Sequence, residues 1–194
     1  MTATVPARVI LVEGASDRIA VEAAARRLGW DLAGVAVVSA EGVGNIGGLA
    51  ARYRGLGVPV AGLCDLAEVV WVCRALVKAK VGIALDRAGL AALGFHALDR
   101  DLEDELIRAV GLERVLDLLA EHGDLEAFRT LQRQRAWRDA ALTDQLRRFL
   151  GAGAGRKIRY AGVFVEALAV ERMPAPLLAV LAALPGLRPD PVLV

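Results

Sequence analysis

The stretch RVILVEGASDRIAVEAAARRL, residues 8–28, decides the fold that we expect for this chain. Val9–Val12 is a short apolar run rich in β-branched residues, and Glu13-Gly14 ends it. Ser16 is a suitable N-cap for a helix. The apolar residues after it recur at i, i+3, i+4 and i+7, namely Val21, Ala24, Ala25 and Leu28. The stretch therefore predicts a strand, a tight turn and a helix with one buried face.

Two carboxylates of this unit are candidates for a ligand site. Glu13 leaves the carboxyl end of the strand and Asp17 enters the first helical turn, where open α/β sheets form their binding crevice. The helix dipole alone also favours an acidic residue at Asp17. Glu13 is harder to explain without a partner, because a carboxylate directly after a buried strand is partly desolvated. The pattern predicts that a cation or a hydrogen-bond donor meets Glu13.

Residues Leu11–Asp17 resemble the first motif of the Toprim domain, and the run to Leu28 most resembles the overcoming-lysogenisation-defect (OLD) family of nucleases. The resemblance implies an α/β Toprim-like (Rossmann-like) fold: a mostly parallel four-stranded sheet flanked by helices, with an α-helical C-terminal subdomain. It also implies that Glu13 is a metal ligand or acid/base, and that further acidic residues hold Mg²⁺ or Mn²⁺ during phosphodiester chemistry.

A second acidic stretch follows a predicted strand at Val58–Cys64. A Toprim domain is expected to carry Asp-x-Asp here as metal ligands, and this chain has Asp65-Leu66-Ala67-Glu68. Asp65 matches the first position, and Ala67 departs from the second. Glu68 is one methylene longer and begins one residue later, so it is a candidate substitute. The site could bind one metal ion, bind two weakly, or be inactive.

A third acidic stretch lies at Asp99–Glu105. Asp101 is a plausible N-cap, and Glu103 shares a predicted buried stripe with Leu106, Ile107 and Val110. A carboxylate on that stripe needs a partner, and a metal is one candidate. The OLD resemblance implies an acidic ligand followed four residues later by glutamate. Asp99 with Glu103 fits best, and Asp101 with Glu105 is the second choice.

The formal net charge of +1 hides a segregation of charge. Residues 99–126 hold ten acidic and three basic residues, whereas residues 127–160 hold nine basic and two acidic ones. Such segments can be solvated helix faces, or an acidic metal site beside a surface for a nucleic-acid backbone. Arg156, Lys157 and Arg159 open a predicted helix, where the dipole disfavours cations, so we expect an anion there. The resemblance implies that Lys157 stabilises charge at a phosphate, and Arg156 and Arg159 are predicted phosphate contacts.

A glycine pattern, GxGxxG at Gly42, Gly44 and Gly47, follows a second predicted strand at Val35–Val38. The dinucleotide fingerprint normally follows the first strand, so we interpret these residues as a glycine-rich turn before a helix. Glycine still leaves room for a phosphate, which makes Gly44 and Asn45 candidate phosphate contacts. Dinucleotide or nucleotide binding at this loop stays open as an alternative function.

Periodicity predicts the remaining elements and a division of the chain. Helices are expected at 46–56, 68–78, 112–120, 125–134, 140–150 and 156–168, and a fourth strand at Leu90–Leu98. We predict a Toprim α/β domain at 1–110, a helical subdomain at 111–173, and a C-terminal helix and tail at 174–194.

Composition restricts the class of protein. No run approaches the ~20 apolar residues that span a bilayer, and residues 1–8 lack a signal-peptide core, so we expect a cytoplasmic protein that is not bound to a membrane. Cys64 and Cys73 support neither a zinc site nor a disulfide framework and are expected to be buried. Residues 151–157 lack the Gly-Lys-Ser/Thr of a P-loop. Full-length OLD proteins have an ATPase, so the resemblance covers their nuclease portion and a separately encoded ATPase is a possible partner.

The sequence thus predicts a Mg²⁺- or Mn²⁺-dependent endonuclease acting on nucleic acid, with DNA favoured over RNA. Its predicted catalytic residues are Glu13 and Lys157. Its predicted metal ligands are Glu13, Asp17, Asp65, Glu68, Asp99 and Glu103. The main alternative is a catalytically degenerate Toprim module that binds nucleic acid or an ATPase partner, and Ala67 is the residue that favours it.

Overall fold

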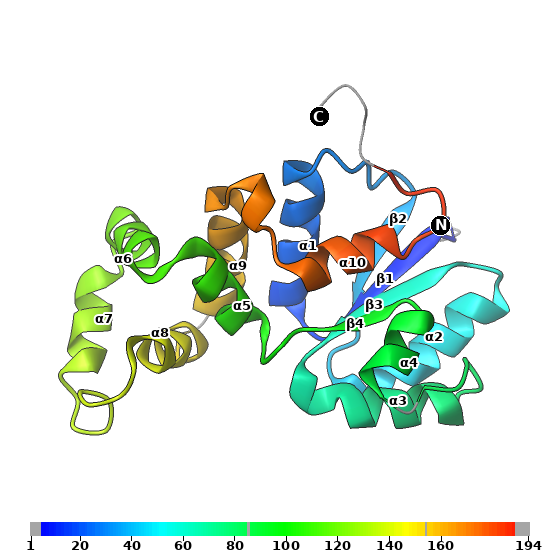
Figure 1. Cartoon of the computed structure of the whole chain (residues 1–194), viewed down its shortest axis with the longest axis horizontal. Coiled ribbons are helices and arrows are strands. Elements are labelled where there is room, and N and C mark those ends of the chain that lie inside the picture. Colours follow the sequence, from blue (N-terminus) through cyan, green and yellow to red (C-terminus); the bar gives the residue numbers. More distant parts are fainter. Residues whose placement is uncertain (1–4, 85, 154, 189–194) are drawn as a thin grey trace.

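A computed structural model describes residues 5–84, 86–153 and 155–188. Its sheet has four strands, β1 (Arg8–Val12), β2 (Val35–Ser39), β3 (Val60–Cys64) and β4 (Phe95–Ala97). The strands lie in the order β2-β1-β3-β4, and every neighbouring pair is parallel (Figure 1). The predicted fold class, a parallel four-stranded sheet flanked by helices with a helical C-terminal part, is confirmed.

Alternate residues of each strand enter two separate cores, because side chains point to opposite faces of a sheet. Ile10 and Val12 of β1 face one core, while Val9 and Leu11 face the other. All four are fully buried, which explains why β1 reads as an unbroken apolar run. Gly62 on β3 makes room for Phe95, since a Cβ at position 62 would lie 2.3 Å from that ring.

Helices cover both faces of the sheet (Figure 1). Helices α2 (Ile46–Gly55) and α3 (Val69–Lys78) join the second core, as does Leu90 of the short helix α4 (Arg87–Ala92). The opposite face is covered by α1 (Ala15–Arg27) and α10 (Ala175–Ala182). Short 3-10 turns occur at Val43–Asn45, Leu66–Glu68 and Val170–Arg172. The sheet is therefore the middle layer of three.

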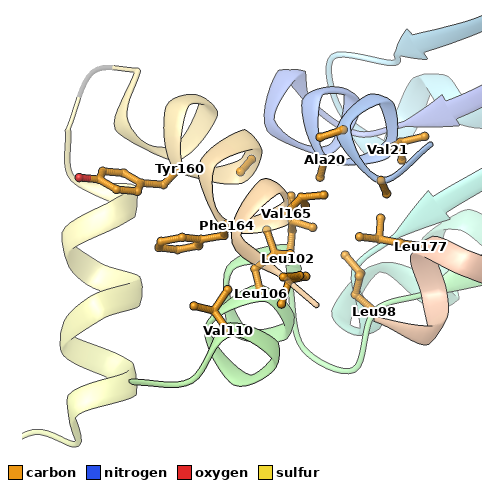
Figure 2. Packing of buried hydrophobic residues seen from close by; sticks show 14 of the residues in the cluster. Ala20, Val21, Leu98, Leu102, Leu106, Val110, Tyr160, Phe164, Val165 and Leu177 are labelled. Carbon is orange, nitrogen blue, oxygen red and sulfur yellow. The ribbon is translucent and has the colours of Figure 1, made fainter. Parts of the chain in front are cut away.

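The helical part consists of α5 (Leu102–Val110), α6 (Leu112–Glu121), α7 (Leu125–Gln132), α8 (Leu142–Gly151) and α9 (Arg156–Ala167). It is joined to the sheet by one continuous core. In Figure 2, residues of α5 and α9 meet residues of α1 and α10, with Leu106, Val165, Ala20 and Leu177 among them. Because α9 packs along α1, the start of α9 is held close to the start of α1. The predicted domain boundaries stay a prediction.

Two local expectations from the sequence are wrong. Ser16 does not cap the first helix: the helix begins at Ala15, Gly14 is its N-cap, and Ser16 is buried in the first turn. The predicted strand at Leu90–Leu98 is shorter, because its first half forms α4. The Asp86 side chain caps α4 by accepting a hydrogen bond from the Gly89 backbone N–H at 2.8 Å, and β4 begins only at Phe95.

The expectation that both cysteines are buried is confirmed, and both are free. Among the described residues, no helix has the length and apolar character that a membrane span requires.

Candidate metal and phosphate site

The site lies at the carboxyl edge of the sheet, where β1 and β3 end side by side. Val9 pairs with Val60 and Leu11 with Gly62, so Glu13 and Asp65 leave neighbouring strands at the same edge. A cavity of about 320 Å³ opens there, lined by Glu13, Asp17, Asp65 and Lys157 together with the backbone around them. We call Glu13, Asp17, Asp65 and Glu68 the edge carboxylates.

Asp17 is held rigidly by the helix that follows β1. It is the third residue of α1, and its carboxylate accepts a hydrogen bond from the Gly14 backbone N–H at 2.9 Å. The side chain satisfies the start of the helix and is only 9% exposed. Burial raises the pKa of Asp17, although the Gly14 N–H and the charge of Lys157 act against that shift.

Asp65 carries the strongest sign of crowded negative charge in the cavity. Its pKa is raised to about 7, first by burial and then by the carboxylates of Asp17, Asp101 and Glu13, while Lys157 opposes the shift. An aspartate with such a pKa is close to half-protonated at neutral pH. A cation bound at this edge would restore its charged form.

Glu68, the candidate substitute for the missing second aspartate, lies beside Glu13. Burial, a hydrogen bond with the Glu13 carboxylate and the charge of Glu13 raise the pKa of Glu68 to about 8. Its Oε2 is buried and has no hydrogen-bond partner among the described atoms. A buried carboxylate oxygen without a partner is costly, and a metal ion would satisfy it.

Lys157 reaches the cavity from α9, on the opposite wall. Its Nζ lies 3.2 Å from Oε2 of Glu103, whose side chain is 13% exposed. Burial lowers the pKa of Lys157, but the negative charges of Glu103, Asp17 and Asp65 together raise it by more than burial lowers it. The net pKa is therefore above the ordinary value. Lys157 is therefore a firmly protonated ammonium group. It is also the partner that the sequence required for Glu103 on its buried stripe.

The edge carboxylates fit a divalent cation in their chemistry. Their oxygens are the hard ligands that Mg²⁺ and Mn²⁺ prefer, and the unpartnered Glu68 Oε2 belongs to the same group. As the side chains stand, no three His, Cys, Asp or Glu residues within the described ranges are grouped closely enough to hold a metal. Metal ligation at this edge therefore requires side-chain rotation toward a common point.

Asp99 lies outside this cavity. Its carboxylate is 2.9 Å from Arg87 and 3.7 Å from Arg108, and it lines a different cavity together with His96. Glu105, the glutamate of the second-choice pair, is 7% exposed although it does not share the predicted stripe of Glu103. Its Oε1 accepts a hydrogen bond from the Asp99 backbone N–H at 2.9 Å. The Glu105 side chain is therefore buried against the loop before α5, which this hydrogen bond closes.

Arg156 and Arg159 form ion pairs within the protein instead of facing the cavity. Both form ion pairs with Asp124, and Arg156 also lies over the Phe149 ring, 3.9 Å from its centroid. Positions 157 and 159 are about 200° apart around a helix, so Lys157 and Arg159 face opposite ways. Asp124 precedes these arginines by more than thirty residues in the sequence, and no local pattern revealed the pairing. Lys157 is the cation of the three that pairs with a carboxylate next to the cavity.

The glycine-rich turn also lies at the carboxyl edge. Its Gly42 N–H donates to the Glu13 carbonyl oxygen at 3.4 Å, while Gly44 and Asn45 are exposed. Gly47 has a packing role, because a Cβ there would lie 2.5 Å from the Ala75 carbonyl oxygen of α3. That role supports the interpretation as a turn before a helix. Contact of Gly44 or Asn45 with a phosphate stays a prediction.

A parallel sheet with carboxylates after β1 and β3 is the arrangement expected of a Toprim-type α/β domain. The model of the "Overcoming lysogenization defect protein-like, TOPRIM domain" matches residues 7–66. The chain therefore carries a Toprim domain that resembles the one of OLD proteins. Glu13, Asp17 and Asp65 lie inside the matched range.

Solved structures extend the likeness in fold beyond that range. The C-terminal region of the Burkholderia pseudomallei OLD protein is similar with a TM-score of 0.69 and 19% identity, covering 93% of this chain and 97% of that one. The C-terminal region of the Xanthomonas campestris pv. campestris OLD protein gives a TM-score of 0.66 and 24% identity, covering 93% and 95%. A comparison with curated protein sequences gave no match.

Proposed function

We propose that this protein is a Mg²⁺- or Mn²⁺-dependent nuclease that hydrolyses phosphodiester bonds in nucleic acid, with DNA as the favoured substrate. The observation that carries the proposal is an imbalance of charge. Four edge carboxylates share one end of the sheet, two of them with a pKa raised to about 7 or 8, and the nearby Lys157 is paired with Glu103. Such a group is suited to a metal ion, and the Toprim resemblance supports the same chemistry.

In this proposal Glu13, Asp17, Asp65 and Glu68 hold the metal. A bound divalent cation would activate water and neutralise charge on the leaving oxygen. Glu103 keeps the Lys157 ammonium at the wall of the cavity, where it can contact a non-bridging phosphate oxygen. Arg156, Arg159 and Asp99 have other partners and are left out of the proposed machinery.

Partners and location follow as further parts of the proposal. A nucleic-acid substrate is expected from the same carboxylates and Lys157. A separately encoded ATPase is proposed as a partner on the sequence resemblance to OLD proteins, whose full-length forms have an ATPase. A location in the cytoplasm is proposed as well.

A second candidate function is a degenerate Toprim module that binds nucleic acid or an ATPase without cleaving. The observation that favours it is Ala67, which leaves the Asp-x-Asp position without its second carboxylate. Glu68 replaces that carboxylate only if its side chain can turn away from Glu13 toward a metal.

The experiment is nicking of supercoiled plasmid with Mg²⁺, Mn²⁺ or EDTA, comparing wild type with Glu13→Gln. We expect metal-dependent nicking that falls at least about 100-fold in the variant, which corresponds to about 2.7 kcal/mol of transition-state stabilisation. Glu22→Gln, the same change further along α1 where Glu22 faces Arg18 at 3.8 Å, is the matched control and should stay active. If folded wild type and Glu13→Gln are equally inert with every metal, the nuclease proposal fails and the binding module takes its place.

A further inference from the structure

A second cavity, in the helical part, has three arginines in its lining. It encloses about 520 Å³, and its lining includes Arg100, Trp137, Asp144, Arg147 and Arg148. Three guanidinium groups face one carboxylate there, so the cavity has the opposite charge to the edge carboxylates. The two cavities share no lining residue. We call this one the arginine groove.

The wall of the arginine groove is built around a buried polar side chain. Gln145 of α8 is 5% exposed and donates hydrogen bonds to the carbonyl oxygens of Trp137 and Ala140, at 2.8 and 3.0 Å. Its Oε1 accepts a hydrogen bond from Gln132 at 2.7 Å. A fully satisfied buried amide fixes backbone position, so the turn that carries Trp137 is held against α8.

The charges of the groove are only partly neutralised. Arg147 pairs with Asp101 and lies 3.6 Å from Asp144, and Arg100 lies 3.1 Å from Asp144 and 3.8 Å from Asp104. Arg148 is exposed and has no carboxylate within ion-pair distance in the described part of the chain. Its guanidinium lies 5.8 Å from the centroid of the Trp137 ring. An available cation beside a partly exposed indole is a combination that single-stranded nucleic acid recognises.

Asp101 connects the groove to the candidate site. Its carboxylate is the partner of Arg147 in the groove, and its charge also acts on Asp65 at the carboxyl edge. Asp101 caps α5, and Glu103, two residues further, holds Lys157. The N-terminal turn of α5 therefore interacts with residues of both the arginine groove and the candidate site.

We propose that the arginine groove holds a single strand of nucleic acid next to the phosphodiester that is cleaved. Arg148 contacts a backbone phosphate, and an unpaired base stacks on Trp137. The inference rests on the proposed function for its place in catalysis. Every base has a face that can stack, so the groove favours single-stranded over paired nucleic acid without reading its sequence.

The test measures binding in EDTA, where cleavage is blocked, by fluorescence anisotropy. The probes are a labelled single strand of about 20 nucleotides, long enough to cover such a site, and its duplex. Arg148→Glu should weaken single-strand binding about tenfold. The slope of log Kd against log salt should fall by the amount expected for the loss of about one or two phosphate contacts. Arg129→Glu, the same charge change on α7 outside the groove, is the matched control.

Trp137 is tested by Trp137→Leu and Trp137→Phe, both checked for folding by circular dichroism. Loss of stacking should weaken single-strand binding about tenfold and duplex binding less than about twofold, and phenylalanine should restore most of it. The proposal is overturned if Arg148→Glu behaves like Arg129→Glu, if Trp137→Leu weakens strand and duplex equally, or if wild type binds neither probe at about 50 mM salt.

Failure of this inference and failure of the nuclease proposal are separable. If wild type does not nick plasmid but Arg148→Glu and Trp137→Leu weaken single-strand binding, the proposal for the arginine groove stands and the nuclease proposal fails. If wild type nicks plasmid and the groove variants bind and cleave as wild type does, the nuclease proposal stands and the proposal for the arginine groove fails.

Discussion

Two clusters of carboxylates lie close together in this protein, and they are neutralised in opposite ways. The edge carboxylates follow β1 and β3, while Asp99, Asp101, Asp104 and Glu105, which we call the α5 carboxylates, surround the start of α5. Every α5 carboxylate has an arginine within ion-pair distance: Arg87, Arg100, Arg108 or Arg147. The edge carboxylates have Lys157 opposite them, and Glu103 shares it.

The pKa values express the same difference. Burial raises the pKa of both Asp65 and Asp101. At Asp101, hydrogen bonds from Arg147 and the Asp104 N–H outweigh burial, and the net pKa is lowered. At Asp65, three neighbouring carboxylates add to burial, and the pKa rises to about 7. Counting acidic residues therefore does not single out the proposed metal site, whereas the lack of arginine partners distinguishes the edge carboxylates from the α5 carboxylates.

The largest effect on stability is expected where an α5 carboxylate does two tasks. The Asp101 side chain accepts a hydrogen bond from the Asp104 N–H at 2.9 Å and pairs with Arg147, whose side chain is 21% exposed. Asp101→Ala removes the helix cap, which costs about 1 kcal/mol, and a charged hydrogen bond worth about 1.5 kcal/mol more. Urea unfolding in EDTA should therefore show a loss of about 2–3 kcal/mol.

Asp101→Asn is the control for that experiment. Asparagine is as good an N-cap as aspartate, so it keeps the cap and removes only the charge, and the loss should be about half as large. Equal stability of wild type and Asp101→Ala would mean that the α5 carboxylates are not structural, and the contrast between the two clusters would disappear.

The sequence was sufficient for the residues that follow strands. Glu13 and Asp65 each end an apolar run, and carboxyl ends of neighbouring parallel strands meet at one edge, so their proximity could be predicted without a structure. The start of α1 was misassigned at Ser16 because Asp17, at the third helical position, hydrogen-bonds back to Gly14 instead. Whether Gly14 or Ser16 caps the helix depends on the geometry of the turn.

The sequence was not sufficient for partners that come from distant segments. Asp99 and Asp101 look alike in the sequence, and which arginine meets each is decided by α4 and α8, which supply Arg87 and Arg147. In the same way Asp124 occupies Arg156 and Arg159 and leaves Lys157 to the cavity. Long-range ion pairs have no periodic signature, so they separate a structural carboxylate from a candidate ligand only once the fold is known.

Substitution of Asp65, one of the edge carboxylates, is expected to have a smaller effect on stability than Asp101→Ala, and of opposite sign. Asp65 has a pKa of about 7 in the folded chain and about 3.9 when unfolded, so between these values the folded state binds more protons. Its contribution to stability is therefore full at low pH and is lost as pH rises from about 4 to about 7. Asp65→Asn removes the repulsion and should stabilise the protein at about pH 8 in EDTA, by about 1 kcal/mol after solvent screening.

Two further conditions sharpen that measurement. At about pH 3, wild type and Asp65→Asn should be about equally stable, because the wild-type carboxyl is then mostly protonated in both the folded and the unfolded state. At about pH 8 Mg²⁺ should raise the unfolding temperature of wild type but not of Asp65→Asn, since ligand binding stabilises only the state that binds it. A destabilised Asp65→Asn at pH 8 in EDTA would contradict the excess of negative charge at the edge.

The smallest effect is expected at Asp99, which the sequence named as a metal ligand. Its side chain is 57% exposed, and both of its arginines are about half exposed, so the pairs are screened by water and are worth less than about 1 kcal/mol. Asp99→Asn should change unfolding free energy by less than that and leave plasmid nicking within about twofold of wild type, because the residue lies outside the cavity of the edge carboxylates. A variant that folds normally but needs far more Mg²⁺ to nick would move Asp99 into the metal site. The loop before α5 would then have to rearrange, releasing Asp99 from Arg87, whenever metal binds.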